Sequence, residues 1–340
     1  MAPIVRHAVS LKALNTFGID ARAGHLVELR AAADLAATIA LLHAHPPVLV
    51  LGGGSNLLFS RDPPGTVLRV MLGGRRLLGE RDGEVLVEAA AGENWHRFVD
   101  WTLAQGLNGL ENLSLIPGSV GAAPVQNVGA YGVEVCERFD SLDAVSLRDG
   151  TARRFDATDC GFGYRDSVFR REAGPPWLIT AVRFRLTRTP QLQLDYGELR
   201  DELRARGIAS PGAREVADAV CAIRRRKLPD PAEIGNAGSF FRNPVVDRAR
   251  ARQLAAAHPG LPLYPGSSPA TAKLSAAWMI DRCGWKGHRD GDAGVHQRHA
   301  LVLVNHGHAS GAQILALAMR IRESVRRQFG IDLEPEPVVV

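Results

Sequence analysis

The stretch that decides the fold is PPVLVLGGGSNLLF, residues 46–59, where a short branched apolar run halts at three glycines and then resumes. This pattern predicts a strand, a tight turn and a second strand. Consecutive glycines let the backbone approach a bound group closely and direct N–H groups at it, as phosphate sites do. No third glycine follows Gly54 at the dinucleotide-binding spacing, and no Gly-Lys-Ser/Thr follows. A phosphate held here would therefore need another fold, and a plain turn is the alternative.

A second glycine-rich stretch is LSLIPGSVGAAPVQNVGAYG, residues 113–132. It has too many glycines for a regular helix or strand, yet it is too apolar for a solvated loop. An irregular segment of this length usually lines a ligand, with backbone amides and Asn127 providing contacts. A buried structural loop is the alternative interpretation.

A third stretch, GNAGSFFRNP at residues 235–244, places one small hydroxyl, Ser239, directly before Phe240 and Phe241. The two rings favour burial and carry the hydroxyl into a dry environment with them. A buried hydroxyl needs a hydrogen-bond partner or a chemical role. Ser239 is therefore a candidate functional residue.

Composition narrows the class of ligand. The chain has 340 residues, 46% of them hydrophobic, which predicts a globular protein of two or three domains. The net charge is only +5, the arginines are mostly scattered, and aromatic residues make up 6%. Nucleic-acid binders concentrate positive charge and interleave aromatic side chains. The composition therefore favours an anionic small molecule over a nucleic acid.

Metal, disulfide and membrane signals are weak. Cys136, Cys160, Cys221 and Cys283 lie far apart, so neither a zinc site nor a disulfide framework is indicated. The run HRDGDAGVH, residues 288–296, matches no familiar ligand spacing, and we expect no metal. The N-terminus lacks the features of a leader, and no run of eighteen apolar residues occurs. We therefore expect a cytoplasmic protein without a membrane segment.

Apolar residues at helical spacing predict several helices. One covers residues 92–106 with Asn94 as N-cap, and another ends before Pro229. A third is expected over 271–287 with Leu274, Trp278 and Ile280 facing inward, and a fourth over 312–330, closing at Gly330. Residues 299–307 read as a buried strand, and the tail after Gly330 is strand-like.

The ordered set of motifs closely resembles the UDP-N-acetylenolpyruvoylglucosamine reductase family. The likeness runs almost from end to end, and eleven motifs in one order are far more specific than any one of them. They are NTFGID, LGGGSNLLF, AGENWHRFV, GLENLSLIPGSVGAAPVQNVGAYG, FGYRDSVF, YGEL, KLPDP, GNAGSFFRNP, AAWMIDRCGWKG, HALVLVN and LEPE. Together with YGEL, the sequence LPLYPG at residues 261–266 resembles the form of the family that closes a loop carrying Tyr264 over its substrate.

The resemblance implies an α+β protein with the vanillyl-alcohol-oxidase-like (PCMH-type) FAD-binding fold and a separate α+β substrate-binding domain. The first FAD-binding lobe is expected to take residues 1–70 and to be completed by the tail, 330–340. The second lobe is expected over 71–225 and the substrate-binding domain over 226–329.

The resemblance also implies a reaction. Members of the family reduce the enolpyruvyl ether of UDP-N-acetylglucosamine-enolpyruvate to UDP-N-acetylmuramate for peptidoglycan, using FAD and NADPH. Hydride adds to the methylene carbon, Ser239 gives a proton to the ether-bearing carbon, and Arg165 and Glu336 polarise the carboxylate. The alternatives are an FAD oxidase of the same superfamily with another substrate, and a non-catalytic flavin or nucleotide-sugar binder. A silent binder has no need of Ser239, Arg165 and Glu336 together.

Binding residues follow from the same resemblance. FAD is expected on the two glycine-rich stretches, at Gly52, Gly53, Gly54, Ser55, Asn56, Pro117, Gly118, Ser119, Gly121, Asn127, Gly129, Ala130 and Tyr131. The substrate is expected at Tyr164, Tyr196, Lys227, Asn243, Tyr264 and Lys286, with the two lysines and Tyr264 on its diphosphate. His299 occupies a position where relatives often carry Gln. We expect a monomer.

Overall fold

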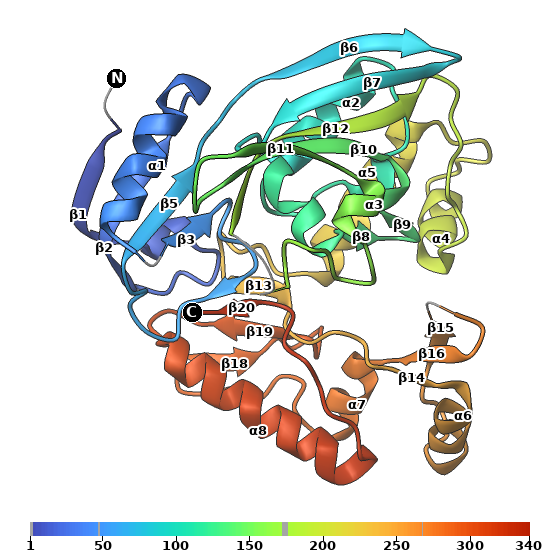
Figure 1. The fold of residues 1–340 in the computed structure, drawn as a ribbon. Helices are drawn as coiled ribbons and strands as arrows, with labels where there is room; N and C mark the ends of the chain where they lie inside the picture. Colours follow the sequence, from blue (N-terminus) through green and yellow to red (C-terminus); the bar gives the residue numbers. More distant parts are fainter. Residues whose placement is uncertain (1–2, 47, 172–175, 267) are drawn as a thin grey trace. The chain divides into compact units, whose positions relative to one another are not determined.

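The computed structural model divides the chain into two compact units, which are described separately (Figure 1). Unit 1 comprises residues 1–9, 23–53 and 64–226, and unit 2 comprises residues 10–22, 54–63 and 227–340. The described residues are 3–46, 48–171, 176–266 and 268–340. The three-domain division expected from the sequence stays a prediction.

The first sheet of unit 1 has the strand order β1-β2-β5-β3. Its strands are β1 (Val5–Ser10), β2 (Arg22–Leu29), β5 (Thr66–Val70) and β3 (Val48–Leu51). β5 pairs in parallel with both β2 and β3, and helix α1 (Leu35–Ala44) joins β2 to β3 (Figure 1). Because parallel strands need a crossover connection, α1 returns the chain to the sheet edge where the glycine turn begins.

The second sheet of unit 1 is antiparallel, in the order β11-β10-β12-β7-β6. Its strands are β6 (Arg75–Arg81), β7 (Glu84–Ala90), β10 (Phe139–Ser146), β11 (Ala152–Asp156) and β12 (Trp177–Thr187). Alternate residues of β7 are buried, as expected for a strand with one face on a core. Helix α2 (Trp95–Ala104) contributes Trp95 and Phe98, whose rings pack against Phe184.

The rest of unit 1 is made of short elements and two longer helices. The longer helices are α4 (Gly197–Ala205) and α5 (Ala213–Lys227), whose last residue is assigned to unit 2. The short helix α3 (Ala157–Cys160) follows β11, and a two-stranded ladder joins β8 (Gly129–Ala130) to β9 (Val133–Glu134). Single 3-10 turns lie at Ala32–Asp34, Glu111–Leu113, Val120–Ala122, Pro124–Gln126 and Val135–Glu137. As the sequence predicts, residues 113–132 form neither an α-helix nor a long strand.

Among the described residues, unit 2 contains three small sheets, in the orders β13-β19-β18-β17, β14-β16-β15 and β20-β4. Helix α8 (Gly311–Phe329) packs on β18 (Ala293–Val295) and β19 (Val302–Asn305) (Figure 1). The tail strand β20 (Val338–Val339) pairs in parallel with β4 (Leu57–Leu58), the strand after the glycine turn. The remaining elements are Lys12–Leu14 (a 3-10 turn), β13 (Gly235–Ser239), β14 (Val245–Asp247), α6 (Arg248–Ala257), β15 (Leu263–Pro265), β16 (Thr271–Leu274), α7 (Ala276–Arg282) and β17 (Arg289–Asp290).

Most local predictions are confirmed. Asn94 caps α2 by accepting a hydrogen bond from Arg97 N at 3.0 Å, and α8 ends at Gly330 with a left-handed φ of 64°. Helix α5 ends before Pro229, and the tail forms a strand. In the described part of the chain, no helix combines the length and the apolar character needed to span a bilayer.

The helix expected over 271–287 is wrong in its bounds. Thr271–Leu274 is strand β16, so Leu274 is buried from a strand and not from a helix. Helix α7 begins only after Ser275, whose Oγ accepts from Trp278 N at 3.3 Å, and it ends at Arg282. Trp278 is half-buried, whereas Ile280 is buried as expected. The apolar spacing runs across a helix cap, and the N-cap serine marks the true boundary.

The fold predicts a pH-dependent stability at Asp143. Buried Arg183 ion-pairs with Asp143 and with Glu88, and hydrogen bonds from Arg183 and Arg154 lower the pKa of Asp143 from 3.8 to about 2. A lowered pKa in the folded state stabilises the fold above the unfolded pKa, and this is lost as pH falls toward the folded value. Asp143→Asn should therefore lower the free energy of unfolding at neutral pH, with the difference from wild type shrinking from about pH 4 downward.

Urea unfolding across this pH range measures the effect. The matched control is Asp201→Asn, because Asp201 lies in an exposed pair with Arg204 that contributes little to stability. A difference between Asp143→Asn and wild type that stays constant with pH would contradict the assignment.

Candidate active site

In unit 1 the two glycine-rich stretches come together through their backbones. A Cβ built on Gly53 would lie 2.8 Å from Gly118 Cα, and one built on Gly52 would lie 2.6 Å from Ser119 Oγ. Because real Cβ atoms do not approach a backbone this closely, Gly53 needs to be glycine, whereas a Cβ at Gly52 would require the Ser119 hydroxyl to move. The two predicted cofactor segments thus form one continuous backbone surface.

The turn continues into unit 2, where it supports the tail. Gly54 has a φ of 62°, and its carbonyl accepts from Thr16 N at 3.1 Å. Asn56 Nδ2 donates to the carbonyl of Glu336 at 3.3 Å, and Asn56 O accepts from Val338 N at 3.0 Å. Ser55 and Asn56 are half-buried. Asn56, predicted to bind flavin, therefore also fixes the backbone around the predicted catalytic Glu336.

Residues 113–132 are held by contacts to α2 and its flanks. Trp95 Nε1 donates to Leu113 O at 2.9 Å, and a Cβ on Gly121 would lie 2.5 Å from the Cβ of Ala91. The Asn127 side chain is saturated within the protein: its Nδ2 donates to Glu134 and to the carbonyl of Gly163, and its Oδ1 accepts from Cys136 N. Asn127 therefore holds the shape of the segment.

Arg165 sits in an uncommon backbone conformation, with a φ of 55°. Its Nη2 donates to Gly129 O at 2.7 Å, and its guanidinium lies over the Tyr164 ring, 5.2 Å from the centroid. A non-glycine residue held at positive φ costs about 1–3 kcal/mol, and such residues cluster at functional sites. The predicted catalytic arginine is thus a strained residue anchored on the predicted flavin segment.

Ser239 ends β13 opposite Val302 of β19. Phe240 and Phe241 are 0% and 1% exposed, and Phe240 N donates to Leu301 O at 2.7 Å. Ser239 itself is half-buried, and the preceding Gly238 has a φ of 71°. The two rings therefore anchor the strand in the core, as the sequence predicts, while the hydroxyl keeps some access to solvent.

The same unit brings Glu336 beside this strand. Glu336 N donates to Phe240 O at 2.8 Å, Arg242 N donates to Glu334 O at 3.0 Å, and Phe241 forms an isolated antiparallel bridge with Pro335. Residues 240–242 and 334–336 are thus paired backbone to backbone. Unit 2 places Ser239 and Glu336 in adjoining segments, whereas Arg165 belongs to unit 1.

The predicted substrate residues lie in both units. Tyr196 is exposed, and the rings of Tyr196 and Tyr131 make an edge contact at 5.2 Å in unit 1. In unit 2, Asn243 Oδ1 accepts from Ala276 N at 3.0 Å, and Lys286 forms an ion pair with Asp281. Tyr264 is exposed and lies opposite Lys273 in the β15–β16 pairing. Lys227 is the last residue of α5.

Sequence reasoning missed Arg224, which lies in the run Arg224–Lys227. Such a run is typical of an exposed basic cluster, but Val216, Val220 and Arg224 follow one another at a spacing of four residues. Val216 and Val220 are buried, so this spacing places Arg224 on the inner face of α5. The four-residue spacing of Arg224 from Val220 and Val216 is the sequence feature that predicts its position on the inner face.

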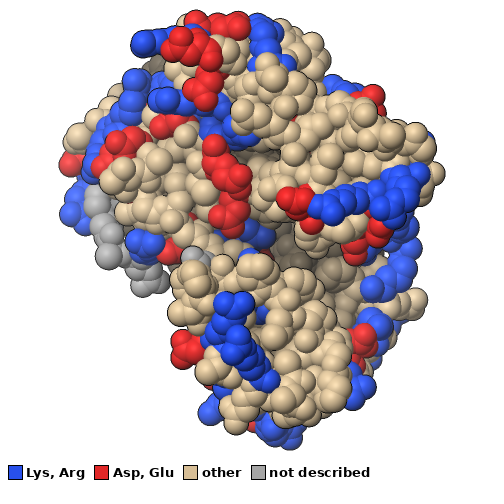
Figure 2. All heavy atoms as spheres, turned by 90° about the vertical axis from the view of Figure 1, so that its right-hand side faces the viewer, with Lys and Arg blue, Asp and Glu red and all other residues tan. Residues whose placement is uncertain are grey.

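Surface charge and cavities add little to the site. Figure 2 shows basic and acidic side chains dispersed over the face in view, and several arginines are paired with carboxylates.

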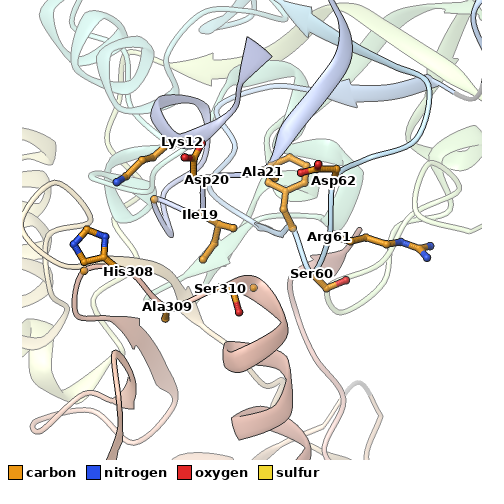
Figure 3. A pocket seen from close by; sticks show the side chains of 14 residues that line it. Lys12, Ile19, Asp20, Ala21, Ser60, Arg61, Asp62, His308, Ala309 and Ser310 are labelled. Atoms are coloured by element: carbon orange, nitrogen blue, oxygen red, sulfur yellow. The ribbon is translucent and has the colours of Figure 1, made fainter. Parts of the chain in front are cut away.

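A cavity of about 280 Å³ in unit 2 is lined by Lys12 and by residues 18–21, 59–62 and 307–311, with Lys12 and Arg61 extending to opposite sides (Figure 3). None of the predicted site residues lines it. Among the described residues, no group of three or more His, Cys, Asp or Glu side chains could hold a metal ion.

Comparisons with known proteins identify the family. Residues 23–156 match the family described as FAD binding domain, and residues 230–340 match UDP-N-acetylenolpyruvoylglucosamine reductase, C-terminal domain. The Pseudomonas aeruginosa protein named UDP-N-acetylenolpyruvoylglucosamine reductase is 58% identical over 96% of both chains. The chain belongs to the UDP-N-acetylenolpyruvoylglucosamine reductase family. A Chromobacterium violaceum protein of the same name is 55% identical over 98% of both chains.

The solved structures agree. The crystal structure of the reductase of this family from Thermus caldophilus superposes with a TM-score of 0.70 at 25% identity, over 99% of both chains. The predicted family and the predicted α+β FAD-binding fold are thereby confirmed. The backbone cradle at Gly52, Gly53 and Gly118 fits a flavin nucleotide, since the close approach leaves no side chain between these amides and a bound phosphate.

The cradle yields a direct prediction for cofactor binding. Gly53→Ala would bring a Cβ against the backbone of Gly118, which cannot yield as a flexible side chain can. We expect the purified variant to hold less FAD than wild type, measured from the ratio of flavin to protein absorbance. Gly79→Ala is the matched control, because nothing lies within 4 Å of a Cβ at Gly79. Equal FAD content in both variants would contradict the placement.

Proposed function

We propose that the chain reduces the enolpyruvyl ether of UDP-N-acetylglucosamine-enolpyruvate to UDP-N-acetylmuramate, with bound FAD and with NADPH as hydride donor. It is thus a UDP-N-acetylmuramate dehydrogenase, an oxidoreductase acting on a CH–CH bond in the synthesis of the peptidoglycan precursor. Full-length similarity to reductases of this name supports the proposal. The structural observation that carries it is the backbone pairing of residues 240–242 with 334–336, which joins Ser239 to Glu336 in unit 2.

Ser239 is the proposed proton donor. Bound FAD would supply hydride to the methylene carbon of the substrate, after which the ether-bearing carbon must take a proton. A positioned hydroxyl can deliver it, and general-acid catalysis of this kind typically contributes about 10² to 10⁴-fold. Buried Phe240 and Phe241 anchor the end of the strand that carries Ser239.

Arg165 is proposed to stabilise the charge that spreads into the substrate carboxylate, and Glu336, in its protonated form, is proposed to donate a hydrogen bond to the same group. A guanidinium matches a carboxylate with two parallel hydrogen bonds, and electrostatic stabilisation is strongest where the group is already oriented. Arg165 is oriented by its bond to Gly129 O and by the Tyr164 ring. The backbone of Glu336 is held by the bond from its N–H to Phe240 O and by the bond from Asn56 Nδ2 to its carbonyl.

The binding residues divide between cofactor and substrate. We propose that FAD is held by backbone groups of Gly52 to Asn56 and of 117–131, with Asn127 acting by shaping that segment. The substrate diphosphate is proposed to meet Lys227, Lys286 and Tyr264, with Tyr164, Tyr196 and Asn243 contacting the remainder. We also propose a monomer in the cytoplasm, where NADPH and nucleotide sugars are available; light scattering tests the first point.

The proton-donor assignment predicts that Ser239→Ala separates the two half-reactions. Reduction of FAD by NADPH requires no proton from Ser239, so anaerobic bleaching should proceed at nearly the wild-type rate. Reoxidation by substrate should slow by about 10² to 10⁴-fold, and Ser239→Cys should recover part of the loss. Stopped-flow absorbance measures both steps. Equal slowing of both steps, or of neither, would refute the role and indicate a structural serine.

The diphosphate assignment predicts the behaviour of Lys286→Ala. Loss of one charge-assisted contact should weaken substrate binding by about tenfold to a hundredfold while the flavin spectrum stays unchanged. Titration calorimetry on the oxidised enzyme measures the affinity. Lys12→Ala is the control, because Lys12 lies in the same unit but lines the separate cavity. If both variants bind substrate as wild type does, Lys286 is not a diphosphate ligand.

A further inference from the structure

The turn that carries Arg165 has a backbone conformation that its sequence does not favour. Gly163 and Asp166 close the turn with two backbone hydrogen bonds, from Gly163 N to Asp166 O at 3.0 Å and from Asp166 N to Gly163 O at 3.2 Å. Arg165 has a φ of 55°, whereas the φ of Tyr164 before it is not positive. This pattern fits a type II turn, whose third residue is usually Gly or Asn. Because an arginine is strained there, contacts from outside the turn must hold it.

Two of these contacts lie at the start and at the tip of the turn. Asn127 Nδ2 donates to Gly163 O at 3.1 Å, and Arg165 Nη2 donates to Gly129 O at 2.7 Å. Asn127 and Gly129 both belong to the proposed flavin-binding stretch 113–132. The turn is therefore attached directly to that stretch, and both contacts are made within unit 1.

The third contact comes from Ser167, directly after the turn. Ser167 is 0% exposed, and its Oγ donates to Val125 O at 2.6 Å while accepting from Phe169 N at 3.3 Å. A hydroxyl that is buried and hydrogen-bonded in this way does not contact a ligand. Any effect of Ser167 on the reaction must therefore be exerted through the residues that it holds.

The place of Ser167 indicates which residue that is. Asn127 fixes the chain two residues before Arg165, at Gly163, and Ser167 fixes it two residues after. If the bond from Ser167 to Val125 is lost, the chain beyond Arg165 is no longer attached to the stretch 113–132. A residue at positive φ persists only where its surroundings impose that conformation, so the turn can then relax and move the guanidinium.

We propose that Ser167 is a positioning residue for Arg165. The proposal rests on the proposed function, in which Arg165 stabilises charge on the substrate carboxylate. Such a group is most effective when the fold has already oriented it, because no reorganisation is then needed as charge develops. Ser167 contributes by holding the strained turn in the one conformation that also lets Arg165 reach Gly129 O.

The first test separates positioning from stability. Ser167→Ala should slow reoxidation of the reduced FAD by substrate by about tenfold, since one lost hydrogen bond to a buried group shifts an equilibrium by about that factor. Reduction of FAD by NADPH should stay at the wild-type rate. Thr66→Val is the matched control, because Thr66 is also 0% exposed in unit 1 and donates to His45 O at 2.8 Å. Both variants should lower the midpoint of urea unfolding, but only Ser167→Ala should slow reoxidation.

The second test is a double-mutant cycle with Arg165→Ala, measured by anaerobic stopped-flow absorbance. In that background Ser167→Ala should cause no further slowing, because its effect is exerted through the guanidinium. Ser167→Cys keeps a weaker donor, so it should fall between wild type and Ser167→Ala, and it takes the place of the alanine variant in the cycle if that variant does not fold. Slowing by the same factor in both backgrounds, or equal slowing in Thr66→Val, would overturn the proposal and indicate a structural serine. Failure of the proposed function is distinct, since substrate would then not reoxidise the wild-type flavin at all.

Discussion

The arrangement of unit 2 depends on the short backbone pairing between residues 240–242 and the tail at 334–336. Three features define it: the bond from Glu336 N to Phe240 O, the bond from Arg242 N to Glu334 O and the bridge of Phe241 with Pro335. Pro335 lacks a backbone donor, so the hydrogen bonds come from its neighbours. The tail then continues to β20, whose pairing with β4 ties it to the residues that follow the glycine turn. One chain of backbone contacts therefore links the turn, the tail and the strand of Ser239.

Unit 1 depends on a different constraint, the absence of side chains where two backbones meet. Gly53 and Gly118 approach so closely that no other residue fits, and Gly121 sits equally close to Ala91. Around this contact the polar side chains are used for shape: Asn127 binds Glu134, Gly163 and Cys136 within the protein. A surface made of backbone amides is well suited to a phosphate or a flavin ring, because its donors are fixed by the fold itself.

Helix caps, helix ends and the burial of neighbouring apolar residues could be predicted from the sequence, because they depend on nearby residues. Asn94 as a cap, Gly330 as a helix end and the burial of Phe240 and Phe241 follow from nearest neighbours and from helical spacing. The true start of α7 could not be read from apolar spacing, because Leu274 fits the helical period although it lies in β16. The sites of positive φ at Leu115, Tyr131 and Arg165 were also hidden, since none of these residue types favours that conformation. Strain imposed by tertiary contacts leaves no mark on composition or spacing.

The strain in these residues costs free energy, which favourable interactions elsewhere in unit 1 must offset. At about 1–3 kcal/mol each, three of them approach the whole stability of an ordinary domain, which is about 5–15 kcal/mol. The packed rings of Trp95, Phe98 and Phe184 lie beside one end of the strained segment, since Trp95 Nε1 donates to Leu113 O. A rigid aromatic core next to the strained backbone can hold it in place, whereas a loop anchored on solvent could not. The strain therefore lies next to a packed core, and two of the three residues, Tyr131 and Arg165, are ones that the family pattern assigns to ligands.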